Sequence, residues 1–248
     1  MKKNPADMHF FDHLEELRWR VIKSAIAIVL FAIPCGIYWK EILDIVMIYP
    51  IQYIEPKPKL IFTAPGEIVM LSLQIAIAGG LIVAAPVVFY QLWCFVSPGL
   101  YKKERRMILP IVIFSTLFFL LGILFCYFMF PLLMKFLVTY AGNRIDPMFK
   151  ANDYFGFLLK LSLSFGIVFE LPVVSFVLAR VGVLTAGFLV KQFRYAIIII
   201  FVIAAILTPP DVVSQSILAA PLLLLYGLSI LVAAVVTKGN KKREALSA

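Results

Sequence analysis

Long uncharged apolar stretches are the feature that most constrains how this 248-residue chain can fold. A helix needs about 20 apolar residues to cross the ~30 Å hydrocarbon layer of a bilayer, and several stretches reach that length. Hydrophobic residues make up 62% of the chain and charged residues 15%, whereas soluble domains have roughly 45–50% and about 25%. We therefore expect a polytopic membrane protein and not a soluble globule.

Six segments are predicted to cross the membrane as helices. The first three contain no charged residue apart from Lys23 at the edge of the first, and the fourth contains Lys160 and Glu170. The last two are separated by Thr-Pro-Pro-Asp at 208–211, where the prolines end a helix, so we expect a tight hairpin there. The predicted spans are residues 21–39, 68–95, 107–134, 154–179, 195–207 and 212–237.

Positively charged residues are distributed unevenly between the predicted loops. Of the 23 Lys and Arg, sixteen lie in the two terminal segments and in the loops after the second and fourth spans, and six lie on the other side. Because cytoplasmic loops are enriched in Lys and Arg, both termini are expected to be cytoplasmic.

Pro34, Pro86 and Pro172 are expected to bend their helices. The predicted fold is all-α, a single integral membrane domain over residues 1–248 with six transmembrane helices in a cupped, kinked bundle.

The sequence also argues against several function classes. A net charge of +9 would suit a nucleic-acid partner, but that binding needs a basic surface in water, so none is expected. The only histidines, His9 and His13, precede the first span, which argues against a Ser-His hydrolase at membrane depth. Their spacing of one helical turn leaves zinc as an alternative, but an amphipathic interfacial helix explains the segment. We expect no catalytic residues, no metal and no cofactor.

Two carboxylates within basic segments are the candidate binding residues. Glu16 lies in His-Leu-Glu-Glu-Leu-Arg at 13–18, and Glu104 directly precedes Arg105 and Arg106 before the third span. Taken alone, these residues favour local neutralisation, in which Glu16 pairs with Arg20 one helical turn later.

Longer motifs resemble the TatC family, whose members are receptor subunits of the twin-arginine protein translocase. They are His-Leu-x-Glu-Leu-Arg at 13–18, Pro-Gly-Leu-Tyr and Glu-Arg-Arg within 98–106, Phe-Gly and Phe-Glu-x-Pro within 165–172, and Leu-Thr-Pro-Pro-Asp-Val with Ser-Gln within 207–215. The motifs occur in the order of the family. The pattern departs at Lys150, where the family often has an acidic residue and where Asp153 could take its place.

The resemblance implies a receptor and core subunit of the cytoplasmic membrane, which recognises paired arginines and moves folded proteins by the protonmotive force. It implies that Glu16 and Glu104 bind the two arginines, because a carboxylate matches the guanidinium fork bidentately. The other residues assigned to this signal-peptide site are Leu17, Arg18, Phe95 and Arg105. The implied partners are twin-arginine signal peptides, the single-span subunits TatA and TatB, the lipid bilayer and further subunits of an oligomeric complex.

A functional role is also expected for one residue within the fourth span and for the hairpin between the last two spans. Glu170 is expected to line a water-filled cavity, because an ionised carboxylate in hydrocarbon costs at least ~2.5 kcal/mol. Pro209, Asp211 and Gln215 are assigned to the outer hairpin as a partner contact.

The alternative function is a proton-coupled secondary transporter of a small solute. Lys160 and Glu170 favour it, because ionisable residues at membrane depth mark ion pathways. Against it, the two residues are ~15 Å apart along a helix, and the chain has no second half that resembles the first as an inverted repeat would.

Overall fold

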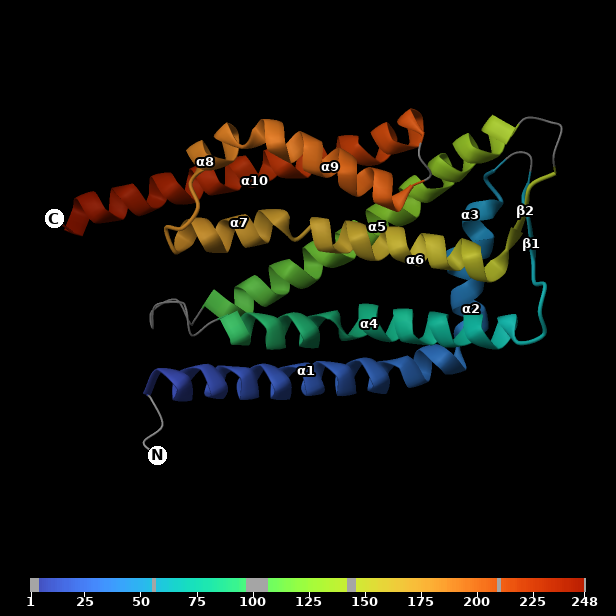
Figure 1. Ribbon diagram of the computed structural model, residues 1–248, viewed down its shortest axis with the longest axis horizontal. Helices are drawn as coiled ribbons and strands as arrows, with labels where there is room; N and C mark the ends of the chain where they lie inside the picture. The colour runs from blue at the N-terminus through green and yellow to red at the C-terminus, as the bar shows by residue number, and fades with distance from the viewer. Residues whose placement is uncertain (1–4, 55–56, 97–106, 142–145, 209–210, 248) are drawn as a thin grey trace. The chain divides into compact units, whose positions relative to one another are not determined.

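The computed structural model of the chain describes residues 5–54, 57–96, 107–141, 146–208 and 211–247. These residues are almost all helical (Figure 1), as the sequence predicted. Five helical segments are long and apolar enough to span a membrane, namely His13–Ile37, Glu67–Val96, Ile108–Tyr140, Ala151–Arg180 and Val212–Gly239. A further apolar helix, Phe193–Leu207, is shorter. The chain is therefore an all-α polytopic membrane protein.

The described residues form two compact units. One comprises Met1–Asp44 and Pro65–Leu117, and the other comprises Ile45–Ala64 and Phe118–Ala248. The elements in chain order are α1 (Pro5–Ile37), α2 (Trp39–Leu43), the π-helix η1 (Asp44–Ile48), α3 (Tyr49–Ile51), β1 (Lys59–Ile61), α4 (Glu67–Val96), α5 (Ile108–Ala141), β2 (Met148–Lys150), α6 (Ala151–Val168), α7 (Leu171–Arg180), α8 (Ala186–Lys191), α9 (Phe193–Leu207) and α10 (Val212–Ser247).

Two helices continue well past the C-terminal ends of their predicted spans. α5 reaches Ala141 and α10 reaches Ser247, whereas the predicted spans end before Lys135 and Lys238. A lysine side chain can carry its ammonium group into the polar layer while its backbone stays helical. A lysine therefore marks the edge of the hydrocarbon layer and not the end of the helix.

Pro172 lies where the fourth predicted span divides into two helices. α6 ends at Val168 and α7 begins at Leu171, so Phe169 and Glu170 form the break. Proline is tolerated in the first turn of a helix, because the N–H groups there have no intrahelical partner. The break places Glu170 at a discontinuity of the backbone.

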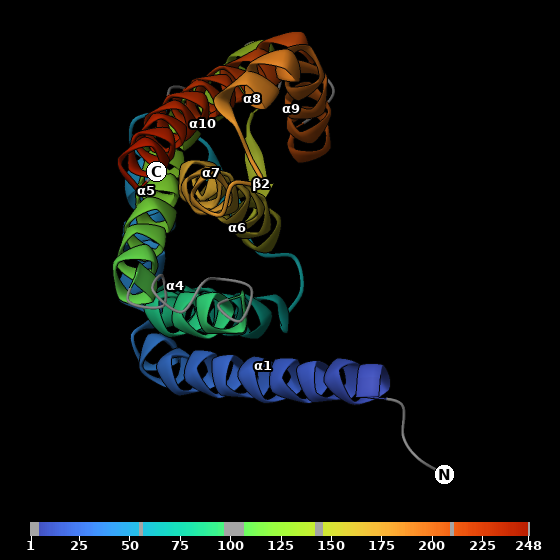
Figure 2. The ribbon, with the colours of Figure 1, turned by 90° about the vertical axis from the view of Figure 1, so that its left-hand side faces the viewer.

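In the first unit, α1 and α4 pack side by side with opposite chain directions (Figures 1 and 2). Gly80 permits the close approach, since a Cβ atom there would lie 2.7 Å from both the carbonyl oxygen of Ile28 and the backbone nitrogen of Ala32. Ala76 and Ala84, one turn on either side of Gly80, are also buried. Such a stripe of small residues is the usual means by which membrane helices pack closely.

In the second unit, α5 and α6 cross closely at two glycines. A Cβ atom on Gly122 would lie 2.7 Å from the carbonyl oxygen of Phe165, and one on Gly166 would lie 2.6 Å from the ring of Phe119. α10 packs along α7, α8 and α9.

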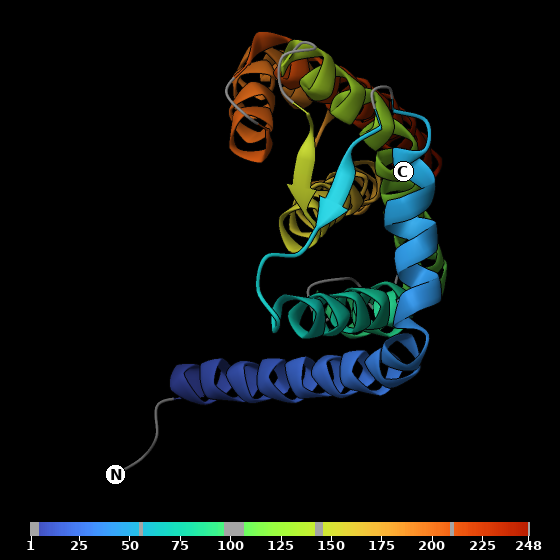
Figure 3. The same cartoon turned by 90° about the vertical axis from the view of Figure 1, so that its right-hand side faces the viewer.

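A short parallel ladder also belongs to the second unit. β1 and β2 pair with Leu60 opposite Phe149 (Figure 3). These strands were not predicted from the sequence, because three residues each are too few to show an alternating pattern.

Candidate functional site

Glu16 lies in the first half of α1 and is paired with Arg20 one helical turn later. The Nε atom of Arg20 donates to Glu16 Oε1 at 3.0 Å, and its Nη2 atom donates to the same oxygen. The Nδ1 atom of His13 lies 3.9 Å from Glu16 Oε2. The side chain of Glu16 is 35% exposed and that of Arg20 is 22% exposed. The local pairing that the sequence predicted is therefore present, and the carboxylate remains open to solvent.

The end of α4 completes the surroundings of Glu16. Phe95 stacks on His13, with 4.3 Å between the ring centroids and 14° between the ring planes. The Nη1 atom of Arg20 donates to Gln91 Oε1 at 3.5 Å. The structure thus brings Phe95, a predicted site residue, to the turns of α1 that carry Glu16. Gln91 was not predicted as a site residue, although it is one of only two amides, with Gln74, in an otherwise apolar segment, and this is a signal that could have found it.

Leu17 and Arg18 lie on the exposed surface of α1. Leu17 is 38% exposed, and neither side chain forms a hydrogen bond or ion pair with Glu16 in the described parts of the chain. Their role in signal-peptide binding stays a prediction.

The loop that carries Glu104 and Arg105 lies outside the described residues. The helices on either side of it are joined by a hydrogen bond at 2.8 Å from Trp93 Nε1 to Ser115 Oγ, and both side chains are buried. The loop leaves α4 directly after Val96, one residue beyond the Phe95 ring that contacts α1. This connection is consistent with a shared site for Glu16 and Glu104, which stays a prediction.

Glu170 is buried, with 9% of its surface exposed. The neighbouring Phe169 ring lies 5.6 Å from Phe125 and 6.4 Å from Phe165 between centroids. Glu170 therefore lies at the break between α6 and α7, next in sequence to a residue of an aromatic cluster. Its place on a water-filled cavity stays a prediction.

Two polar residues near the connection between α9 and α10, Asp211 and Gln215, have side chains that form hydrogen bonds. Asp211 Oδ1 accepts the backbone N–H of Ser214 at 2.7 Å and so caps the start of α10. The side-chain amide of Gln215 donates to the carbonyl oxygen of Phe201 on α9 at 2.7 Å. Pro209 lies outside the described residues. These bonds give both polar residues a structural role, and their contact with a partner stays a prediction.

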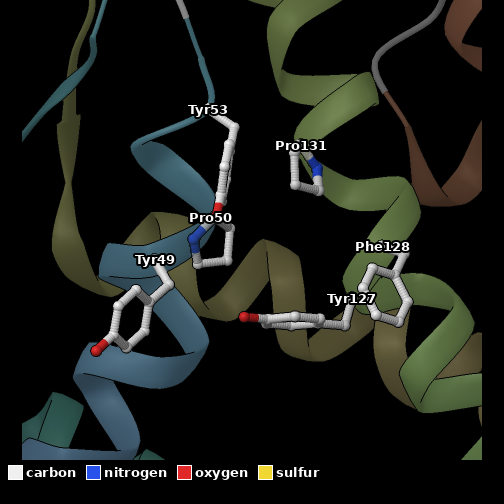
Figure 4. Close-up of a pocket in the computed structure, with 6 residues that line it drawn as sticks. All are labelled: Tyr49, Pro50, Tyr53, Tyr127, Phe128 and Pro131. Atoms are coloured by element: carbon white, nitrogen blue, oxygen red, sulfur yellow. The ribbon is translucent and has the colours of Figure 1, made fainter.

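Two hollows in the second unit were not predicted from the sequence. The first has a volume of about 490 Å³ and is lined by six aromatic or proline residues, shown in Figure 4: Tyr49, Pro50, Tyr53, Tyr127, Phe128 and Pro131. Tyr127 donates its hydroxyl hydrogen bond to the carbonyl oxygen of Ile45 at 2.9 Å, which joins α5 to η1. The second hollow, of about 510 Å³, includes Lys150, Asp153 and Thr208 in its lining. Both hollows combine distant segments, so no local sequence pattern marks them.

Comparisons with known proteins all point to one family. Residues 12–221 match the family described as Sec-independent protein translocase protein (TatC). The protein of that name from Helicobacter pylori strain J99 is 41% identical over 233 residues, covering 94% of this chain and 91% of the relative. The one from Aquifex aeolicus is 40% identical over 240 residues, covering 95% and 98%. A crystal structure of the twin arginine translocase receptor TatC, 40% identical, superposes with a TM-score of 0.80 over 91% of this chain and 99% of that one.

Proposed function

Because the chain belongs to the TatC family of Sec-independent protein translocase proteins, we propose that it recognises paired arginines in the signal peptides of folded precursor proteins. The chain is a multi-pass protein of the inner membrane and a translocase component, and it is not an enzyme. In this proposal it binds the signal peptide on the cytoplasmic side, and the protonmotive force drives transport of the precursor.

The guanidinium already bound to Glu16 is the observation that carries the proposal. The bond from Arg20 supports the ability of the Glu16 carboxylate to bind an arginine side chain. The Glu16 side chain is 35% exposed, so a peptide could reach it. An arginine presents a planar fork of N–H donors, whereas a lysine presents a compact point charge. Glu16 and Glu104 would each bind one arginine of the pair, with Arg18 and Arg105 beside them and Leu17 and Phe95 as the apolar surface.

Binding of a fluorescent twin-arginine signal peptide to the purified full-length chain tests this assignment. Glu16→Gln and Glu104→Gln should each weaken binding about tenfold or more, since a charge-assisted hydrogen bond contributes about 1.5–3 kcal/mol. Glu15→Gln is the matched control, because it removes the same charge from the neighbouring exposed position. Thermal unfolding should be almost unchanged in all three variants. If both assigned variants bound twin-arginine peptide normally and still rejected a twin-lysine peptide, the site would be elsewhere.

We propose that the hairpin of Pro209, Asp211 and Gln215 is the outer contact for the single-span subunits TatA and TatB in an oligomeric complex. Val212 is 78% exposed beside Asp211, so a photo-crosslinker there should capture a single-span subunit in membranes. Val183, which is 74% exposed in the connection before α8, is the control position and should give no such product. Equal capture from both positions, or none from 212, would contradict the contact.

We also propose that Glu170 lines a water-filled cavity in the membrane. Its position at the helix break supports this, because a wet cavity satisfies the backbone groups that a broken helix leaves without intrahelical partners. Glu170→Gln should fold and bind signal peptide normally but should reduce transport. A cysteine at 170 should react with a water-soluble thiol reagent. Failure to react from either side of the membrane, while cysteines on other faces of the helix react, would exclude the cavity.

A further inference from the structure

Arg20 occupies the carboxylate that the proposed function assigns to a signal-peptide arginine. We propose that Arg20 is an internal substitute for that arginine, which occupies Oε1 of Glu16 until a ligand with its own guanidinium displaces it. The inference rests on the proposed function and adds to it a residue that sets, from inside the receptor, how strongly a ligand must bind.

The geometry of the pair leaves a route for displacement. Nε and Nη2 of Arg20 both reach the same oxygen, Glu16 Oε1. The other oxygen, Oε2, has His13 Nδ1 at 3.9 Å, which is beyond hydrogen-bond distance. An incoming guanidinium can therefore bind Oε2 first, at a side chain that is 35% exposed, and then take over Oε1.

Arg20 also has a second acceptor to which it can turn. Its Nη1 atom lies 3.5 Å from Gln91 Oε1 on α4. Release from Glu16 would leave the guanidinium beside this amide, where the side chain is only 22% exposed. Because Glu16 and Arg20 stand on adjacent turns of one helix, the exchange requires a change of side-chain conformation and no change of fold.

The internal pair competes with every ligand for the Glu16 carboxylate. Partly exposed pairs at this spacing are weak, so a ligand that forms an equally good fork at Glu16 and makes further contacts can replace Arg20. A lysine ammonium is compact and strongly hydrated, and it does not reproduce the planar fork. Arg20 therefore lowers the apparent affinity of every displacing cation by the same factor, so a lysine pair, which binds Glu16 more weakly from the start, occupies the site only at still higher concentration.

The test compares binding of a twin-arginine and a twin-lysine signal peptide to the full-length chain in lipid nanodiscs. Arg20→Met removes the guanidinium and keeps an apolar stem, and it should tighten twin-arginine binding about two- to tenfold. Twin-lysine binding should tighten by about the same factor, so the ratio of the two affinities stays near that of wild type. Arg20→Lys keeps the charge and loses the fork, and it should tighten the binding of both peptides by a smaller factor. This second variant and the thermal unfolding midpoints keep the test valid if Arg20→Met folds poorly.

Two controls separate the possible results. Lys23→Met removes one exposed positive charge from the next turn of α1, so equal tightening by Lys23→Met and Arg20→Met would mean a net-charge effect and would overturn the inference. Unchanged or weaker twin-arginine binding in folded Arg20→Met, while Glu16→Gln still weakens binding, would overturn the internal substitute and leave the proposed function in place. Normal binding by Glu16→Gln would instead contradict the proposed function.

Discussion

Lys160 on α6 donates a hydrogen bond from its ammonium nitrogen to the carbonyl oxygen of Ile206, at 3.1 Å. Ile206 belongs to the last turn of α9, and Pro209 and Pro210, three and four positions later, have no N–H to donate to its carbonyl group. A cation at this end also complements the negative end of the helix dipole. A lysine in an apolar segment favoured the alternative of a proton-coupled transporter, but its bond to Ile206 gives it a capping role in the fold.

Replacing Lys160 with methionine should destabilise the protein. The variant loses a charged donor to a helix C-terminus, and we expect a loss of about 1–2 kcal/mol in the free energy of unfolding. Lys160→Arg retains a donor and should lose less. Thermal unfolding of the full-length chain in one detergent measures both. A methionine variant with the unfolding midpoint of wild type would show that the bond contributes nothing.

Asp211→Ala should remove the N-terminal cap of α10. Asp211 Oδ1 accepts the backbone N–H of Ser214 at 2.7 Å, and loss of such a cap typically costs about 1 kcal/mol. Asp211→Asn keeps the acceptor and loses the charge, so its unfolding midpoint should stay near that of wild type. If Asn were as harmful to stability as Ala, the charge and not the cap would be the important property.

Gly80→Ala should weaken the packing of α1 on α4. The added methyl group would meet backbone atoms of Ile28 and Ala32 at 2.7 Å, and such overpacking typically costs about 1–3 kcal/mol. Gly227→Ala is the matched control, because Gly227 lies inside α10 with no atom within 4 Å of its added Cβ. The control should be neutral or slightly stabilising, since alanine favours a helix more than glycine does. Equal unfolding midpoints for the two variants would contradict the close approach.

The helices could be predicted from the sequence because insertion into a membrane depends on the length and apolar character of each segment by itself. Apolar length alone identifies a span, and the ends of α4 lie one residue outside the predicted 68–95. The pair of Glu16 and Arg20 follows equally from helical spacing.

Contacts between helices could not be predicted in the same way. The bonds from Arg20 to Gln91 and from Gln215 to Phe201 depend on which helices pack together. Apolar periodicity does not contain that information, because nearly every face of a membrane helix is apolar. Motif resemblance identified Asp211 and Gln215 as important, but the structure was needed to show what they bind.

The length of α9 leads to a prediction about the membrane itself. Its 15 residues extend ~22 Å, against ~30 Å of hydrocarbon. An earlier start, with Lys191 and Arg194 reaching the polar layer, would lengthen it, but the helix is interrupted at Gln192, where φ is −87° and ψ is 2°. We therefore expect the connection to α10 to end below the outer headgroups, with local thinning of the bilayer.

Spin labels in lipid vesicles measure this depth directly. Ile206 and Val212, which are 64% and 78% exposed, lie on either side of the connection, and Tyr140, which is 83% exposed, lies near the end of the much longer α5. Labels at 206 and 212 should be less accessible to a water-soluble relaxation agent than a label at 140. Thinning around the short helix would lower the barrier that a folded precursor must cross. Labels at 206 and 212 at the level of the outer headgroups, in a bilayer of unchanged thickness, would show that α9 spans the membrane fully by tilting or by joining α8.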